Sequence, residues 1–208
     1  MPRHSVELAA QFARRVRSID RGRFRLEKLV QAGHLESRIA TQMYEGLYLS
    51  AHISFEHFIE ELFVGLLVDG RGVQSQRNAV RPRITVGSHR VARDILVPGQ
   101  RSYVDWLPYD NTVKTARKVF HGGRPFSELT KAELATLEKC QIIRNVIAHH
   151  SRFSVARFEK KVLANTPLPP VERTPAGYLR GLFRATPSQT RFEEVCAQLI
   201  RVAHRLAR

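Results

Sequence analysis

The spacing of apolar residues along the chain predicts a mostly helical protein. In residues 5–19 apolar side chains recur every three or four positions, which is the spacing of an amphipathic helix. These residues are Val6, Ala9, Phe12, Val16 and Ile19. The pair Arg21-Gly22 then predicts a break, followed by a short helix over residues 23–32. The longest pattern runs from about Leu35 to Val68, contains no proline, and predicts a long core helix.

A helix is also expected to begin at Asp110 or Asn111, because both residue types favour helix N-caps. Its apolar pattern continues to about Phe120, where Gly122-Gly123 ends it.

Two capping boxes predict the last long helices. In such a box a threonine side chain and a glutamate three residues later satisfy free backbone N–H groups at a helix start. Thr130 with Glu133 starts a helix that ends near His150, and Thr190 with Glu193 starts the final helix.

Two segments lack this periodicity. Residues 69–109 are rich in glycine and proline and predict an irregular insertion, with a short strand at residues 83–86. Residues 165–187 predict a proline-rich loop with a small hairpin around residues 177–184. With the final helix at residues 190–207, we expect all 208 residues to form one all-α domain with irregular decorations.

The charge of the chain favours a polyanionic partner. Basic residues number 34, of which 27 are arginine, and the net charge is +15. Such an excess attracts nucleic acid through its phosphates. The alternative is that the arginines form an ordinary solvated surface. The basic residues are scattered along the sequence, and no basic tail stands out.

The cysteine content and the hydropathy of the chain indicate the cellular compartment. Cys140 and Cys196 are the only cysteines, which excludes a disulfide framework and favours a cytoplasmic protein with two buried thiols. No apolar run is long enough to span a membrane. The first residues carry charges where a signal peptide needs an apolar stretch.

The stretch CQIIRNVIAHH, residues 140–150, carries the candidate chemistry. Its isoleucines and valine point in nearly all directions around a helix, so we expect the segment to be buried on most sides. A charged group there must be paired or used, because burial without a partner costs several kcal/mol. Asn145 and His149 share a helix face. Arg144 lies about 140° from His149, but its long side chain can reach the same cleft.

The order Arg144-Asn145-three residues-His149 resembles the R-x4–6-H signature of the HEPN superfamily, whose motif lies on a late core helix of an all-α bundle. The long helix with FEHFIEELF and the motif helix resemble the two helices that enclose that family's site. The RNA-ligase-associated and abortive-infection branches are the most similar. The resemblance covers residues 35–68 and 110–150.

The resemblance implies a metal-independent endoribonuclease without cofactors, acting at a homodimer interface. His149 would move a proton at the ribose 2′-OH or the leaving oxygen. Arg144 would stabilise charge on the phosphate. The resemblance also implies a bacterial toxin or anti-phage effector that cuts RNA, with an antitoxin or another neutralising protein as a possible partner.

Five further residues are candidates to support the site. Asn145 can orient His149 or bind a phosphate oxygen. Glu56 lies at the edge of the apolar stripe of the long helix and can pair with Arg144 or fix a histidine tautomer, and His52 lies beside it. His150 is a weaker candidate because it lies about 100° round the helix from His149. Arg152 is a candidate contact to RNA.

Two other functions remain open. A non-catalytic HEPN module would bind RNA, a nucleotide or a partner protein. In a basic helical structural protein, Arg144 would merely tie its helix to a neighbour and His149 would be a satisfied core histidine.

A metal site formed by His52, Glu56, His57 and Glu60 is disfavoured. The two histidines are five residues apart and do not share a helix face, and the chain has no H-E-x-x-H motif.

Overall fold

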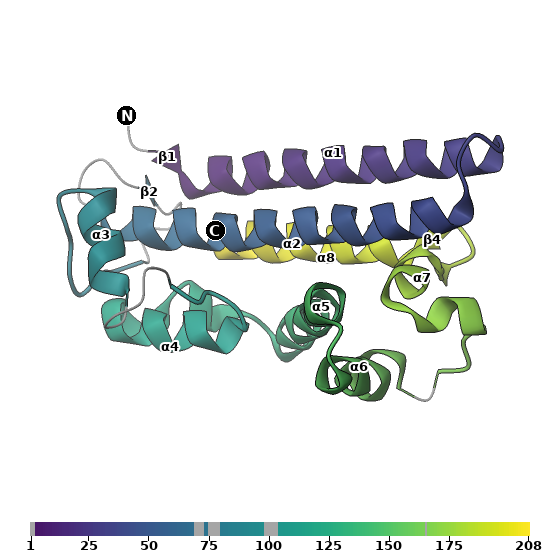
Figure 1. The fold of residues 1–208 in the computed structure, drawn as a ribbon. Helices are drawn as coiled ribbons and strands as arrows, with labels where there is room; N and C mark the ends of the chain where they lie inside the picture. Colours follow the sequence, from purple (N-terminus) through teal and green to yellow (C-terminus); the bar gives the residue numbers. More distant parts are fainter. Residues whose placement is uncertain (1–2, 69–72, 75–79, 98–103, 165) are drawn as a thin grey trace. The chain divides into compact units, whose positions relative to one another are not determined.

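The computed structural model describes residues 3–68, 73–74, 80–97, 104–164 and 166–208, and most of them are helical (Figure 1). The prediction of an all-α fold is confirmed. The α-helices of this part of the chain are α1 (Ser5–Gln31), α2 (Ser37–Leu67), α3 (His89–Leu96), α4 (Tyr109–Val119), α5 (Lys131–His149), α6 (Arg152–Phe158), α7 (Pro175–Arg180) and α8 (Arg191–Leu206).

Shorter elements connect the helices. In the described residues β1 (Arg3–His4) pairs in parallel with β2 (Val73–Gln74), and β3 (Leu182–Arg184) pairs antiparallel with β4 (Gln189–Thr190). The described part of the chain also forms 3₁₀ turns at His121–Gly123, Phe126–Glu128 and Pro170–Arg173, and a π-helical turn at Glu159–Leu163. None of the described helices combines the length and apolar character of a membrane span.

The chain divides into two compact units. The first contains residues Met1–Ala13, Phe55–Ala135 and Ile200–Arg208, and the second contains Arg14–Ser54 and Thr136–Leu199. Four helices, α1, α2, α5 and α8, begin in one unit and end in the other. The expectation of a single domain stays a prediction.

An aromatic cluster forms part of the core of the first unit. The ring of Phe63 on α2 lies 4.8 Å from Trp106, 5.0 Å from Phe120 and 4.7 Å from Phe126, measured between centroids. Such pairs add about 0.5–1.5 kcal/mol each beyond the burial of their area. The cluster therefore holds the segment around α4 against the end of α2.

The core of the second unit joins α2 to α5 and α8. Tyr44 of α2 meets Phe192 of α8 edge to face at 5.7 Å between ring centroids. The Tyr48 hydroxyl donates a hydrogen bond of 2.8 Å to the Cys140 carbonyl on α5. Cys140 and Cys196 are both buried and free, as expected, and burial raises the pKa of the Cys140 thiol to about 11. Both thiols therefore act as apolar core groups.

Both predicted capping boxes are confirmed. The backbone N–H of Thr130 donates to Glu133 at 2.7 Å, and the N–H of Glu133 donates back to the Thr130 hydroxyl at 3.3 Å. At the start of α8 the corresponding bonds between Thr190 and Glu193 measure 2.6 and 3.2 Å. Long helix α2 also lies close to its predicted bounds.

The predicted break at Arg21-Gly22 is wrong, because α1 continues for 27 residues through Gly22. A Cβ atom at Gly22 would lie 3.7 Å from a Leu47 side-chain carbon, so the glycine is simply the small residue where α1 packs on α2. The apolar stripe of the first helix is correct except for Val6, which is 36% exposed, and Ile19, which is half-buried.

The predicted strand at residues 83–86 is also wrong. Val86 forms only an isolated bridge with Val68, and the described part of the insertion instead contains helix α3. Residues 69–72, 75–79 and 98–103 of this insertion lie outside the described residues.

Two predicted boundaries are also corrected. The N-cap of α4 is Pro108, without a side-chain hydrogen bond, rather than Asp110 or Asn111. The C-terminal hairpin exists, but it spans Leu182 to Thr190. Residues 177–180 belong to α7 because the Thr174 side chain caps that helix.

We predict that Gly22→Ala raises the free energy of unfolding by about 0.5–1 kcal/mol, because alanine is favoured over glycine inside a helix. The matched control is Gly33→Ala. Gly33 has φ +72°, so a side chain there is strained and should cost about 1 kcal/mol. Urea unfolding measures both. Destabilisation by Gly22→Ala would argue for the break that the sequence suggested.

Candidate functional site

The motif lies on α5, within the second unit. Ile142, Ile143 and Val146 are buried, and Ile147 is half-buried, as the sequence predicted for most sides of this segment. The hydrogen bond from Tyr48 fixes the start of the same stretch. The polar side chains therefore leave the helix on its remaining side, where Arg144 and Asn145 are half-buried and His149 is exposed.

Arg144 and His149 meet at the end of α5. Nη1 of Arg144 lies 3.2 Å from Nε2 of His149. The long arginine side chain thus spans the angle of about 140° that separates the two residues around the axis of an ideal helix. A guanidinium only donates hydrogen bonds, so Nε2 of His149 is the acceptor in this contact.

Asn145 links this pair to Gln141. The Arg144 Nη1 donates to Asn145 Oδ1 at 3.3 Å, and Gln141 Nε2 donates to the same oxygen at 3.1 Å. Gln141 was not predicted as a site residue. The signal that could have found it is its spacing of four from Asn145, which puts the two amides on one helix face.

His52 of α2 lies close to Arg144 and Gln141. Its side chain is 3% exposed, and its Nδ1 has no hydrogen-bond partner. Burial and the positive charge of Arg144 lower the pKa of His52 to about 4, although the Gln141 side chain acts in the opposite direction. His52 is therefore a neutral ring at pH 7.

Glu56 follows one turn after His52 on α2, in the first unit, where it is half-buried. Its pairing with Arg144 stays a prediction. Glu60 accepts a hydrogen bond of 2.8 Å from Arg93, which also binds Glu61 at 3.1 Å. Within the described residues no group of three or more His, Cys, Asp or Glu side chains is placed to hold a metal ion.

An exposed corner follows the motif. His150 directly follows α5, has φ +43°, and exposes its side chain to solvent. Ser151 caps α6 by accepting a hydrogen bond of 3.1 Å from the backbone N–H of Ser154. Arg152, the candidate RNA contact, is exposed at the first position of α6. His149, His150 and Arg152 thus face solvent at one helix junction.

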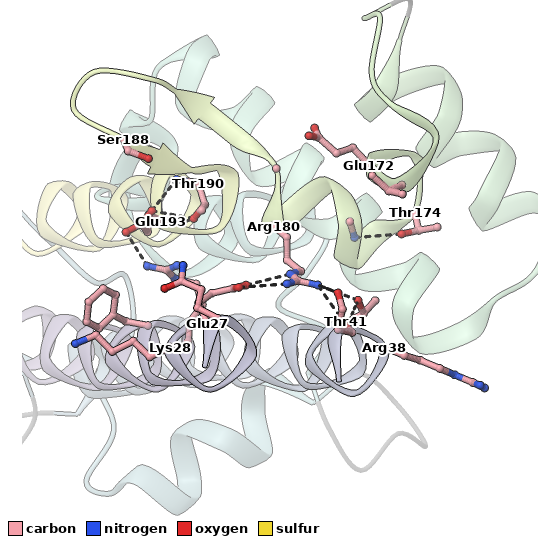
Figure 2. A pocket seen from close by; sticks show the side chains of 17 residues that line it. Glu27, Lys28, Arg38, Thr41, Glu172, Thr174, Arg180, Ser188, Thr190 and Glu193 are labelled. Carbon is pink, nitrogen blue, oxygen red and sulfur yellow. Dashed lines mark hydrogen bonds and ion pairs between the residues drawn. The ribbon is translucent and has the colours of Figure 1, made fainter. Parts of the chain in front are cut away.

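A second polar feature, which the sequence did not predict, is a cavity of about 980 Å³ in the second unit (Figure 2). Arg180 donates to both carboxylate oxygens of Glu27 at 3.0 and 3.2 Å, and to the hydroxyls of Ser37 and Thr41. Burial favours the neutral form of Glu27, but Arg180 outweighs it and lowers the carboxyl pKa below its usual value.

A buried arginine completes the lining of this cavity. Arg23 is 5% exposed and binds Asp20 and Glu193, each at 2.7 Å. Burial alone would lower the pKa of Arg23, but its pairing with Asp20 raises it above the usual value. The charges that line the cavity wall are therefore largely matched within the protein itself.

No family model matches the chain, and no curated protein or solved structure is detectably similar to it. The HEPN resemblance thus rests on the motif and its helical setting.

We predict that His52 makes the free energy of unfolding depend on pH. Its folded pKa of about 4 lies below the ordinary value of about 6.5. As pH falls below about 6.5, the unfolded chain binds a proton first, so stability declines until about pH 4. The slope contributed is up to about 1.4 kcal/mol per pH unit. Urea unfolding at several pH values should show a flatter profile for His52→Gln.

The influence of Arg144 on His52 can be measured separately. Arg144→Gln should raise the His52 pKa, because it removes a nearby positive charge. The control Arg157→Gln, which removes the guanidinium that binds Glu138 on the surface, should leave it unchanged. NMR titration of the His52 ring protons measures this pKa in the wild-type protein and in both variants. A His52 pKa near 6.5 in the wild-type protein would contradict its buried position.

Proposed function

We propose that the protein is a metal-independent endoribonuclease of the HEPN type, with Arg144 and His149 as its catalytic residues. The contact of 3.2 Å between Nη1 of Arg144 and Nε2 of His149 is the observation that carries the proposal. It pairs a proton acceptor with a fixed cation at an exposed helix end, which is the combination that cleavage through the ribose 2′-OH needs.

In the proposed reaction a phosphodiester takes the place of the imidazole in front of Arg144. The guanidinium then binds a non-bridging oxygen, and Nε2 of His149 accepts the proton of the 2′-OH. The 2′-oxygen bonds to phosphorus while the bond from phosphorus to the 5′-oxygen breaks. The leaving oxygen takes a proton from solvent or from a protonated histidine of a second copy of the chain.

The supporting residues have separate roles in this proposal. Asn145, held by Gln141, sets the position of the Arg144 guanidinium. His150 and Arg152 lie beside the catalytic pair and would contact phosphates on either side of the cut. The neutral ring of His52 contributes no charge of its own near Arg144, so the guanidinium stays available to phosphate.

The biological setting follows from the same proposal. We infer a cytoplasmic homodimer that acts as a toxin or anti-phage effector and is neutralised by another protein. Light scattering of the purified protein tests the dimer. The net charge of +15 supports RNA as the partner, because phosphate neutralisation drives such binding.

We predict that His149→Ala and Arg144→Ala each lower the cleavage rate by about 10²–10⁴-fold, the usual value of a general base or a charge-stabilising group. Arg144→Lys should restore little, because lysine lacks the planar fork of donors. His150→Ala should lower the rate less than either of these changes, because His150 contacts only a flanking phosphate in this proposal. Timed gels of a labelled RNA give these rates, and full activity in the double variant would remove both residues from the mechanism.

The products provide an independent prediction. The 5′ fragment should end in a 2′,3′-cyclic phosphate and the 3′ fragment in a 5′-OH, with or without EDTA. DNA of the same sequence should bind but remain uncut, since it lacks the 2′-OH. Mass spectrometry of the fragments identifies the ends. RNA that is bound yet uncut would favour the non-catalytic module, and activity that EDTA abolishes and magnesium restores would point to a metal-dependent nuclease.

A further inference from the structure

The part of α1 in the second unit carries an uneven distribution of charge. Residues 14–31 contain seven basic and two acidic side chains. Both acidic side chains are bound by arginines. Asp20 binds the buried Arg23. Glu27 binds Arg180, as Figure 2 shows. Arg23 is therefore the only basic residue of this segment that is paired with a carboxylate of the segment, and the other six have none.

These cations line up on one side of the helix. At 100° per residue, five of them and one aromatic residue fall within an arc of about 100°. They are Arg14, Arg17, Arg21, Phe24, Arg25 and Lys28, and all are exposed. We call this set the α1 basic stripe. The buried residues Val16 and Leu26 point to the opposite side of the helix.

The stripe exists only because α1 is continuous through Gly22. Successive cations are about one helical turn apart, which is roughly 5.4 Å along the axis, and Arg14 to Lys28 spans roughly 21 Å. None of the stripe's cations forms an ion pair with a described residue. Like charges held along one line repel one another, so the stripe suits an extended polyanion.

Phe24 interrupts the cations with an exposed aromatic ring. It is 53% exposed, and Nζ of Lys28 lies 4.7 Å from its ring centroid. Both side chains also line the cavity of about 980 Å³. A ring in this position offers a face on which an unpaired base can stack, with a cation beside it for the neighbouring phosphate.

We propose that the α1 basic stripe binds a single strand of nucleic acid, with phosphates on its cations and a base on Phe24. That this strand is RNA rests on the proposed function, whereas the charge and the exposed ring call only for a single strand. A duplex fits less well because its bases are already stacked. A membrane surface also fits less well, because the apolar side of α1 is buried in the core, and within residues 14–31 Phe24 is the only apolar residue in the arc.

The experiment compares two variants that lose the same charge. The stripe variant is Arg14→Gln/Arg17→Gln/Arg21→Gln, and the control is Lys114→Gln/Arg117→Gln/Lys118→Gln on the exposed side of α4. Both are made in the full chain carrying His149→Ala, so that RNA stays intact. Fluorescence anisotropy with a single-stranded RNA of about 12 nucleotides measures Kd over a range of salt concentrations.

We expect the stripe variant to weaken binding at least tenfold. The salt slope, which is the slope of log Kd against log salt concentration, should fall by about two, because three cations are lost and each phosphate contact on a single strand contributes roughly 0.7. The control should change Kd less than threefold. Arg14→Lys/Arg17→Lys/Arg21→Lys should bind as the parent does, which separates loss of charge from loss of fold. Phe24→Ala should weaken binding about tenfold with an unchanged salt slope, because stacking carries no counterion release.

Equal losses in the stripe and control variants would overturn the proposal, because net charge alone would then explain binding. So would equal affinity for duplex RNA with no effect of Phe24→Ala. Binding to phosphatidylserine vesicles that depends on the stripe, without any change in RNA affinity, would replace the strand by a membrane. The cleavage assay is independent: a stripe that binds RNA in a protein that never cuts it would refute the proposed activity and leave this inference standing.

Discussion

The need to cover helix α2 organises the structure. Over its 31 residues α2 projects large aromatic side chains in several directions, and burying each stabilises the fold by about 1.5–3 kcal/mol. In the first unit Phe63 is enclosed by the segment around α4. In the second, Tyr44 packs on α8, and Tyr48 finds the carbonyl of Cys140 on α5. The requirement that the buried Tyr48 hydroxyl be hydrogen-bonded thereby fixes the position of the helix that carries the candidate site.

This constraint explains the geometry of the motif. With Ile142, Ile143 and Val146 turned into the core, the polar residues of α5 share the remaining side. Arg144 cannot enter the core without a carboxylate, so its side chain runs along the helix toward His149 and the amide of Asn145. The same core keeps His52 neutral, since burial penalises its protonated form. A neutral ring near Arg144 also avoids repulsion between two cations.

The charge of the molecule follows a related rule. The chain has 34 basic and 19 acidic residues, so carboxylates are the scarce partner. Buried or half-buried arginines need them most, and Asp20, Glu27 and Glu193 are bound by Arg23 and Arg180. The exposed arginines of α1 have no carboxylate partner among the residues that the structure describes, which gives this side of the helix its strong positive field.

The sequence by itself determined the elements whose causes are local. The apolar period placed α2 and α5, and the threonine–glutamate pairs placed the starts of α5 and α8, because these signals act within one or two helical turns. It also drew attention to Arg144, Asn145 and His149 from their spacing. Tertiary structure decided what depends on distant partners. Packing of α1 on α2 overrode the break at Gly22, and burial turned His52 into a neutral group. The approach of Arg144 to His149 needed both a long side chain and a buried opposite face. Scattered arginines became a line only because α1 is continuous through Gly22. The arrangement of charge in space follows from the fold and cannot be read from composition.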